Sequence, residues 1–414
     1  MSTPAIKVPI PFKSICSCTF DEREVEAAAR LLRDPDRLFR HRGEPGECDA
    51  FEREVCALTG AKHALFVASG TSSLSCCLAA LEIGPGDDVV IPAYTYIATA
   101  AAVIDVGAIP ILAEIDESLG LDPADVERKI TPYTKAIIAV HMQGVPCQLD
   151  EIRAVAKKHG LYMIEDCCQA IGARYHGDYC GVHSDAFAWS LNYYKTITCG
   201  ESGVFFANDE HAFQMGVCQS DPANLMWKHG LADADTVKPF SRAGYRANEL
   251  SAAVARVQLS KLEGIVEATR RLKKRLLAGL REPIHYQLQK AGDPEGDAGI
   301  SFAIVCHTPA LTQRMTEELA REGLEVGSIY NAKGFPDRHI YAHWDSIMNM
   351  NAPTPAQYPW KDPAYKGKVA YSRDMCPRTL DILNRCLRIA LNPDMTLEHM
   401  DMIAEAYNNA DARL

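Results

Sequence analysis

The chain lacks the features that mark a membrane protein or a nucleic-acid-binding protein. None of its apolar runs approaches the roughly 18 residues of a membrane-spanning helix, and residues 1–13 have no continuous apolar segment such as a secretory signal needs. Its formal net charge of −11 repels a polyphosphate backbone, and no basic run with interleaved aromatic residues offsets it. The sequence therefore predicts no membrane partner and no nucleic acid partner.

Paired cysteine motifs are also missing. The 15 cysteines are scattered and no two stand in a Cys-x-x-Cys arrangement, so we expect neither a zinc ribbon nor a disulfide framework. A reducing, cytoplasmic environment is predicted. His339 and His343 have the one histidine spacing that a helix could use to hold a metal, and we expect them to lie at the surface or to face a substrate. No metal site is predicted.

What the sequence does contain is enough apolar material to bury a site. Its 414 residues, 47% hydrophobic and 23% charged, exceed one ordinary core, so we predict a large domain over 1–280 and a small one over 281–414. In the large domain, strand patterns alternate with helical ones. This alternation predicts an α/β fold with a mostly parallel sheet covered on both faces. The expected strands are 64–67, 89–91, 109–113, 136–141 and 162–165, and the expected helices include 20–34, 48–59, 74–81, 99–106, 123–130 and 149–159.

The pattern changes after residue 195. Residues 213–244 have weak periodicity and are predicted to be a long irregular excursion, and 249–280 to be one long helix or a bent pair. The second lobe is expected to hold a strand at 300–306 and helices at 311–322 and 397–410. Residues 331–372, rich in proline and aromatic residues, are predicted to form loops that cover a substrate.

Lys195 is the most informative residue. It follows the apolar run 186–189 and Ser190, and it precedes the glycine turn 200–203. The apolar run should place it at the carboxyl edge of the sheet, where an amine can form a Schiff base with a carbonyl compound. The alternative is an ordinary solvated lysine.

Three further candidate side chains stand at or just after apolar strands. Asp166 ends one such strand, where a carboxylate needs a cationic partner, and a protonated pyridine nitrogen is such a partner. Gln169, three residues on, can reach a ring hydroxyl. Tyr94 follows another strand and can stack on a pyridine ring. The alternatives are a helix-capping arrangement for Asp166 and a core aromatic for Tyr94.

Residues 69–72, Ser-Gly-Thr-Ser, lie between a strand and a helix. Backbone N–H groups at such a helix N-terminus can bind an anion, and glycine allows a close approach. An ordinary serine cap is the alternative. The segment is no dinucleotide fingerprint, and Gly84-Pro85-Gly86 precedes a strand and cannot place a pyrophosphate on a helix.

Each of these signals is weak alone, but their order is specific. The glycine–threonine turn, the aromatic residue after a strand, Glu-Asp-x-x-Gln and Ser-x4-Lys together resemble the DegT/DnrJ/StrS family of fold-type I pyridoxal phosphate (PLP) aminotransferases. The resemblance runs from about residue 51 to 262 and continues more loosely to the C-terminus. Further motifs that carry it are 110–116, 131–137, 140–144 and 245–250.

The resemblance implies an aspartate aminotransferase-like fold, with a large mostly parallel-sheet domain and a smaller α+β C-terminal domain, and PLP as cofactor. It implies Lys195 as the Schiff-base lysine, Asp166 at the pyridinium nitrogen, Gln169 at the ring oxygen and Tyr94 stacked on the ring. The phosphate would be held by Gly70, Thr71, Ser72 and Ser190. A homodimer with shared active sites is implied as well, with Arg246 or Asn248 in the segment that reaches across.

The implied reaction moves an amino group from glutamate or glutamine to a keto-sugar, a sugar nucleotide or a cyclitol ketone in a biosynthetic pathway. A lysine rather than a histidine at position 195 speaks against the sugar 3-dehydratase branch. Residues 195–200 and 293–297 are similar to the 8-amino-octulosonate transaminases but do not fix the substrate, whose specificity we expect in loops such as 331–344.

The chain departs from the family pattern at two positions. Ser202 replaces a usual glycine, and Gly244 stands where an asparagine often precedes the arginine by two residues. These departures leave a second reaction class open, namely elimination, decarboxylation or carbon–carbon bond formation by a PLP enzyme of the same fold. A PLP-binding sensor without turnover is a third hypothesis, against which the intact Lys195, Asp166 and Gln169 weigh.

Overall fold

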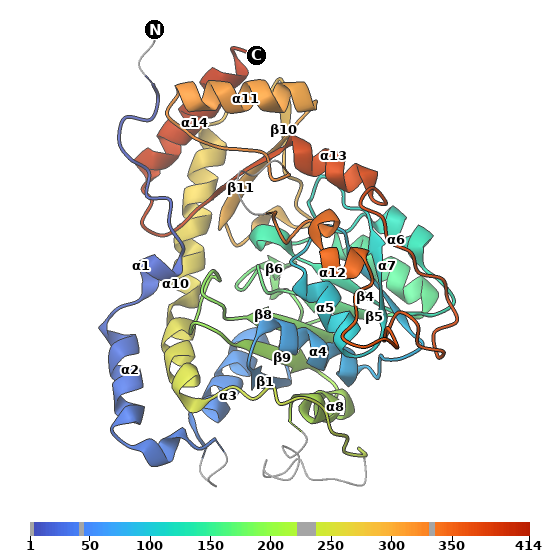
Figure 1. Cartoon of the computed structure of the whole chain (residues 1–414). Coiled ribbons are helices and arrows are strands. Elements are labelled where there is room, and N and C mark those ends of the chain that lie inside the picture. The colour runs from blue at the N-terminus through green and yellow to red at the C-terminus, as the bar shows by residue number, and fades with distance from the viewer. Residues whose placement is uncertain (1–3, 41–44, 222–236, 331–335) are drawn as a thin grey trace.

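Two β-sheets organise the described part of the chain, and one long helix runs past both of them (Figure 1). A third, two-stranded sheet is formed by β6 (Arg174–Tyr175) and β7 (Asp178–Tyr179). The computed structural model describes residues 4–40, 45–221, 237–330 and 336–414. The larger sheet has seven strands and the smaller one three.

The seven-stranded sheet is parallel except at one strand. In spatial order its strands are β1 (His63–Val67), β9 (Gly203–Ala207), β8 (Ala186–Ser190), β5 (Tyr162–Asp166), β4 (Thr134–Val140), β2 (Asp88–Pro92) and β3 (Ile109–Ala113). Strand β9 runs antiparallel to both of its neighbours, β1 and β8, and all other pairs are parallel. The predicted mostly parallel α/β sheet is confirmed.

Helices cover both faces of this sheet, because alternate residues of each strand point to opposite faces. Leu65 and Val67 of β1 belong to one core cluster, and Ala64 and Phe66 of the same strand belong to the other. The first cluster also takes side chains from α4 (Gly70–Ala80), α5 (Ala98–Asp105) and α8 (Glu210–Ser220), and the second from α3 (Glu47–Thr59), α6 (Pro123–Lys129), α7 (Leu149–His159) and α10 (Glu249–Gly279).

The small sheet is antiparallel and lies in the C-terminal part of the chain. Its strands are β10 (Tyr286–Leu288), β11 (Ser301–Cys306) and β12 (Cys386–Ala390), in that order. Helices α11 (Pro309–Arg321) and α14 (Leu397–Asp411) pack on it around a third core that includes Phe302, Tyr407 and Leu387. Helix α13 (Pro377–Arg385) leads directly into β12.

Helix α10 connects the two parts. It has 31 residues, begins beside α3 in the large lobe and reaches α14 in the small one (Figure 1). The N-terminal helices α1 (Cys16–Thr19) and α2 (Glu22–Leu32) lie along it. The domain boundary at residue 280 stays a prediction, although α10 ends one residue before it.

One expected loop is in fact helical in its first part. Helix α8 (Glu210–Ser220) begins just before the predicted excursion 213–244 and takes up its first eight residues. It forms because Asp209 caps its N-terminus and Phe213 and Val217 are buried. Residues 222–236 of that excursion, and 331–335 of the predicted covering loops, lie outside the described ranges. Short helices η4 (Tyr341–His343) and α12 (Asp345–Met348) follow. Within the described part of the chain, no helix combines the length and apolarity needed to cross a bilayer.

Candidate functional site

Three chain segments meet at the carboxyl edge of the large sheet. Asp166 is the last residue of β5, Ser190 is the last residue of β8, and Gly70 is the first residue of α4. A Cβ atom on Gly70 would lie 2.7 Å from the Ser190 Cβ and 3.1 Å from the Cys168 Sγ. The structure thus brings the predicted phosphate-binding turn, the Ser190 hydroxyl and the Asp166 segment together, at a position where only glycine fits.

The N-terminus of α4 is capped, and it also keeps free donors. The Ser69 hydroxyl accepts the Ser72 amide at 3.1 Å, and the Ser72 hydroxyl donates to the Ser69 carbonyl at 2.9 Å, so Ser72 is engaged within the turn. In the described part of the chain, no acceptor takes the amide N–H of Gly70 or of Thr71. The capping interpretation is therefore confirmed for Ser69, and two amides next to Ser190 can still bind an anion.

The Asp166 carboxylate is buried and held by two donors. The Thr99 hydroxyl donates to Oδ2 at 3.0 Å and the Cys168 amide donates to Oδ1 at 3.0 Å. The Thr99 hydroxyl in turn bonds that of Thr95 at 2.7 Å. Each carboxylate oxygen can accept more than one hydrogen bond, so these contacts orient Asp166 and leave it able to meet a further donor. Thr99 lies 67 residues from Asp166, and no sequence signal links the two.

Lys195 is half-buried in the turn after β8, where its amide donates to the Asn192 carbonyl at 3.0 Å. Its ammonium forms no ion pair with any carboxylate in the described ranges. Burial raises the pKa of the Cys168 thiol well above its usual value, and the positive charge of Lys195 acts against that rise. The Lys195 ammonium therefore lies close enough to the Cys168 thiol to influence it electrostatically.

Gln143, which the sequence analysis did not single out, connects two predicted site residues. Its side-chain Nε2 donates to the Tyr94 hydroxyl at 2.7 Å, and its backbone N–H donates to the Gln169 Oε1 at 3.3 Å. Gln143 has a φ of +61°, a left-handed backbone conformation that residues other than glycine seldom adopt. Because the carbonyl oxygen of Gln169 is engaged, its amide group remains to donate a hydrogen bond to a ring oxygen.

Tyr94 itself is only 3% exposed, whereas Tyr96 is 48% exposed. Both rings lie near His339, at centroid distances of 6.3 and 5.3 Å. The core-aromatic interpretation of Tyr94 fits this burial, and stacking on the cofactor stays a prediction for it.

The segment predicted to cross to a partner chain lies at the edge of the large lobe. Asn248 caps α10, with its Oδ1 accepting the Ser251 amide at 2.9 Å. Arg246 forms an ion pair with Asp221 at 3.1 Å, and its side chain remains 58% exposed. The backbone of Arg246 forms a β-bridge with Val67, the last residue of β1, three residues before Gly70.

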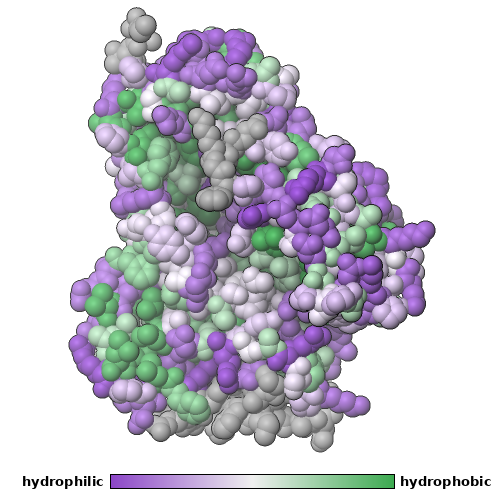
Figure 2. Space-filling view, viewed as in Figure 1, coloured by the Kyte–Doolittle hydropathy of each residue, from purple (hydrophilic) through white to green (hydrophobic). Residues whose placement is uncertain are grey.

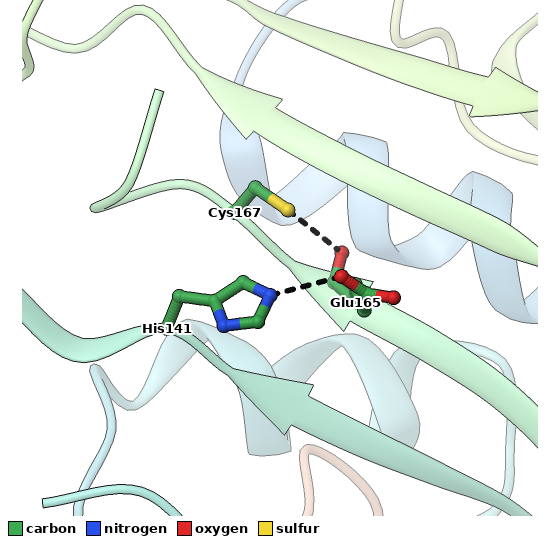
Figure 3. A group of neighbouring side chains, drawn as sticks. All are labelled: His141, Glu165 and Cys167. Carbon is green, nitrogen blue, oxygen red and sulfur yellow. Dashed lines mark hydrogen bonds and ion pairs between the residues drawn. The ribbon is translucent and has the colours of Figure 1, made fainter. Parts of the chain in front are cut away.

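His141, Glu165 and Cys167 form a buried cluster behind this site (Figure 3). The Glu165 carboxylate accepts hydrogen bonds from His141 at 3.0 Å, from Arg153 at 2.9 Å and from the Gly181 amide at 2.7 Å. Burial alone would raise the pKa of Glu165, but its partners His141 and Arg153 outweigh burial and lower that pKa. Three donors thus satisfy the Glu165 carboxylate. Because Glu165 precedes Asp166 in β5, these bonds hold the end of the strand that carries Asp166.

His339 and His343, the pair with helical spacing in the sequence, each hydrogen-bond to Asp337. The His339 Nδ1 bonds the Asp337 carboxylate at 2.7 Å, and the His343 Nδ1 bonds the Asp337 backbone carbonyl at 2.9 Å. Among the described residues, these histidines belong to no group with metal-binding geometry.

The fold is that of the fold-type I PLP-dependent enzymes. The chain belongs to the DegT/DnrJ/EryC1/StrS aminotransferase family, whose sequence profile matches residues 22–354. PLP is the cofactor of this family and of this chain.

Two relatives and one solved structure illustrate the similarity. The GDP-perosamine synthase of Vibrio cholerae is 35% identical over 241 residues, which cover 57% of this chain and 64% of that protein. The L-glutamine:2-deoxy-scyllo-inosose aminotransferase of Streptoalloteichus tenebrarius is 35% identical over 249 residues, 58% of each chain. The chain thus spans about three fifths of the length of these relatives. The structure of DesV from S. venezuelae in complex with a ketimine intermediate superposes with a TM-score of 0.74 and 26% identity, covering 100% of both chains.

The residues at the strand edge fit PLP. Gly70 leaves space where a Cβ would collide, two helix-terminal amides beside a serine hydroxyl suit a phosphate, and a buried carboxylate suits a pyridinium.

Gly70→Ala is expected to weaken PLP binding by about tenfold or more, because the new Cβ forces the start of α4 away from Ser190. Titration of the cofactor-free protein with PLP, followed by absorbance, measures this effect. Gly264→Ala is the matched control, since nothing lies within 4 Å of a Cβ there. Equal PLP affinity in both variants would contradict the phosphate assignment.

Removal of the Glu165 carboxylate by Glu165→Leu is expected to cost about 3–5 kcal/mol of unfolding free energy, because Arg153 and His141 lose a buried partner. Folding lowers the pKa of Glu165, so its contribution is present above the unfolded-state pKa of about 4.3 and is lost as the pH falls through the folded-state value. Urea unfolding at several pH values measures both effects. Glu127→Gln, at an exposed ion pair with Lys158, is the control and should change stability much less.

Proposed function

We propose that the protein is a PLP-dependent aminotransferase that moves an amino group from glutamate or glutamine to a keto-sugar, a sugar nucleotide or a cyclitol ketone. The observation that supports the proposal is the meeting of Asp166, Ser190 and the open α4 N-terminus at one edge of the sheet, in a chain of this family. Lys195 lies in the turn that follows Ser190. When bound, PLP supplies an electron sink that stabilises the carbanion left when a substrate carbon loses its proton.

In this proposal each residue of the chain has one task. The Asp166 carboxylate holds the positive charge of the pyridine nitrogen, and Thr99 and the Cys168 amide keep that carboxylate in place. The Gly70 and Thr71 amides, with the hydroxyl groups of Thr71 and Ser190, form the phosphate site. Ser72 was predicted for it as well, but its hydroxyl already donates to the Ser69 carbonyl and its amide to the Ser69 hydroxyl. Gln169 donates to the ring oxygen. The Lys195 amine would hold the cofactor through a Schiff base and would then accept the proton that the substrate carbon loses.

The aromatic partner of the ring is either Tyr94 or Tyr96. Tyr94 is the residue predicted from the sequence, and its bond to Gln143 fixes its ring. Tyr96 is an added candidate because about half of its side chain is exposed on the adjoining turn. Exposure of a ring face is what stacking requires.

The names of the two relatives support the substrate class. One makes perosamine on a GDP carrier, and the other is named for glutamine and a cyclitol ketone. A keto group beside several hydroxyl groups is common to both kinds of acceptor. Glutamate and glutamine both stay as candidate donors, and a cytoplasmic location stays a proposal that the 15 free cysteines support.

We also propose a homodimer with shared active sites. An apolar surface is exposed on the N-terminal segment around α2, at the lower left of Figure 2, and comprises Phe20, Val25, Leu32, Leu38 and Phe39. Exposed apolar surface of this kind favours association. The segment 244–248 is the candidate to reach the partner's site, because Arg246 is largely exposed and the space around Gly244 is open.

Neither departure from the family pattern favours another reaction. Ser202 is 1% exposed and its carbonyl accepts the Leu191 amide at 2.8 Å, so it holds the turn after Lys195. The glycine that the packing requires is Gly203, where a Cβ would lie 2.4 Å from the Ser69 carbonyl oxygen. The tests below therefore keep two other hypotheses as possible outcomes. One is elimination, decarboxylation or carbon–carbon bond formation, and the other is a sensor without turnover.

Borohydride reduction of the PLP-loaded protein is expected to fix the cofactor on the peptide that contains Lys195. Mass spectrometry of the digest identifies the labelled lysine. Lys195→Ala should bind PLP without such a label. A label on any other lysine in the wild-type protein would overturn the assignment of Lys195.

Glutamate or glutamine alone is expected to convert the bound cofactor to its amine form, with one equivalent of the matching keto acid released per site. Loss of the visible absorption band and keto-acid analysis measure this half-reaction, and ping-pong kinetics should follow with an acceptor. Asp166→Asn should slow the conversion by orders of magnitude while PLP is still bound.

Turnover of a substrate that leaves the cofactor unchanged, with no amine form from any common donor, would replace transamination by the second reaction class. PLP binding with no turnover of any substrate would favour the sensor.

A further inference from the structure

A cavity lies where the C-terminal half of α10 meets the loop between β10 and β11. Side chains of β11 and the large-lobe residue Val145 complete its walls, and its volume is about 220 Å³. None of the residues that line it is among those assigned to PLP above. The cavity is therefore a feature that the proposed function does not explain.

The walls of the cavity contain a continuous supply of apolar side chains. Val145 and Phe302 are buried, whereas Leu277 and Leu288 are each 37% exposed and so border its opening. Ligand sites in proteins are concave and mainly apolar, and burial of apolar area contributes to binding. These walls suit the apolar body of a small ligand.

The loop that forms one wall is fixed to the large lobe. The Gly292 amide donates to the Pro146 carbonyl at 2.9 Å, and the Ala298 amide donates to the Gly144 carbonyl at 2.9 Å. Because the loop is bonded to the large lobe at both of these points, the cavity keeps its shape without a ligand.

One buried polar atom of the lining has no partner. The Gln289 Nε2 donates to the Ser118 carbonyl at 2.8 Å, but its Oε1 is buried and no described residue donates to it. A buried acceptor without a donor costs free energy, and a ligand N–H or O–H that reached this oxygen would remove the cost. The cavity thus offers one polar contact beside its apolar walls.

The lining also carries an excess of positive charge. Lys273 and Lys274 each form an ion pair with a carboxylate of the loop. Arg270 instead donates to two backbone carbonyls, that of Asp297 at 2.6 Å and that of Gly296 at 3.1 Å, and no carboxylate of the described residues forms an ion pair with it. Neutral carbonyls fix the guanidinium without cancelling its charge, so the cavity attracts an anion.

We propose that this cavity is a second ligand site, which binds a small anion with an apolar body and one hydrogen-bond donor. The apolar body contacts Leu277 and Leu288, the donor bonds the Gln289 Oε1, and the anionic group lies near Arg270 and Lys274. The proposal goes beyond the proposed function, because it concerns residues that take no part in PLP binding.

Two probes separate the apolar and the ionic parts of this interaction. Anilinonaphthalene sulfonate has apolar rings, an N–H donor and a sulfonate, whereas phenylnaphthylamine has the same rings and N–H without the sulfonate. Fluorescence titration of the PLP-loaded full chain measures the affinity for each probe. The wild type is expected to bind both in a saturable way, and the sulfonate more tightly.

The variants change one wall property at a time. Lys274→Glu reverses an exposed charge at the cavity and is expected to weaken the sulfonate probe about fivefold or more, with phenylnaphthylamine unchanged. Leu277→Gln should weaken both probes. Arg271→Glu and Leu397→Gln are the matched controls, since both residues are exposed on helices and neither lines the cavity. Neither control should change the affinity for either probe.

Unchanged affinity for the sulfonate probe in Lys274→Glu overturns the proposal, and so does an equal loss in Arg271→Glu. A wild type without saturable binding of that probe overturns it as well. Melting temperature and PLP content of each variant exclude misfolding as the cause. Failure of the proposed function is a separate result, because formation of the amine form is measured without either probe.

Discussion

The close approach of helix α4 to the ends of β5 and β8 is the constraint on which the site depends. Gly70 is the point of contact, since no side chain fits between its backbone, the Ser190 side chain and the Cys168 sulfur. This packing sets the amides of Gly70 and Thr71 beside the Ser190 hydroxyl and holds them near Asp166. A helix N-terminus, a hydroxyl and a buried carboxylate then surround one small region, which is the chemical combination that PLP needs.

A second constraint ties this region to the small lobe. Gln143 adopts a left-handed backbone conformation and contacts Tyr94 and Gln169, and its carbonyl accepts the Ser301 hydroxyl of β11 at 2.9 Å. The next residue, Gly144, also has a positive φ, and its carbonyl accepts the Ala298 amide at 2.9 Å. Because both lobes bond the same short segment, the small sheet has a defined position relative to the Gln169 side of the site.

The departures from the family pattern have little effect on this arrangement. Ser202 adds a hydroxyl inside a turn whose backbone contacts are complete, and the glycine required by the packing at Ser69 is the next residue, Gly203. Gly244 lies at the margin, 4 Å or more from other atoms at its Cβ position. Neither position touches Asp166 or Thr99, so the polar core of the site is the same with or without the family's usual residues there.

The sequence by itself determined the alternation of strands and helices, and therefore the parallel sheet, because hydrophobic periodicity and turn residues are local signals. It also determined that Asp166 and Ser190 stand at strand ends and that Gln169 and Lys195 follow them closely, since the strands are apolar runs. Weak periodicity concealed α8, because most of its residues are buried and it therefore has no clear polar face. The roles of Thr99 and Gln143 were beyond the sequence for a related reason. Their contacts join residues that are far apart in the chain, so their roles depend on which strand ends become neighbours and which face of the small sheet meets the large lobe, and only packing decides both.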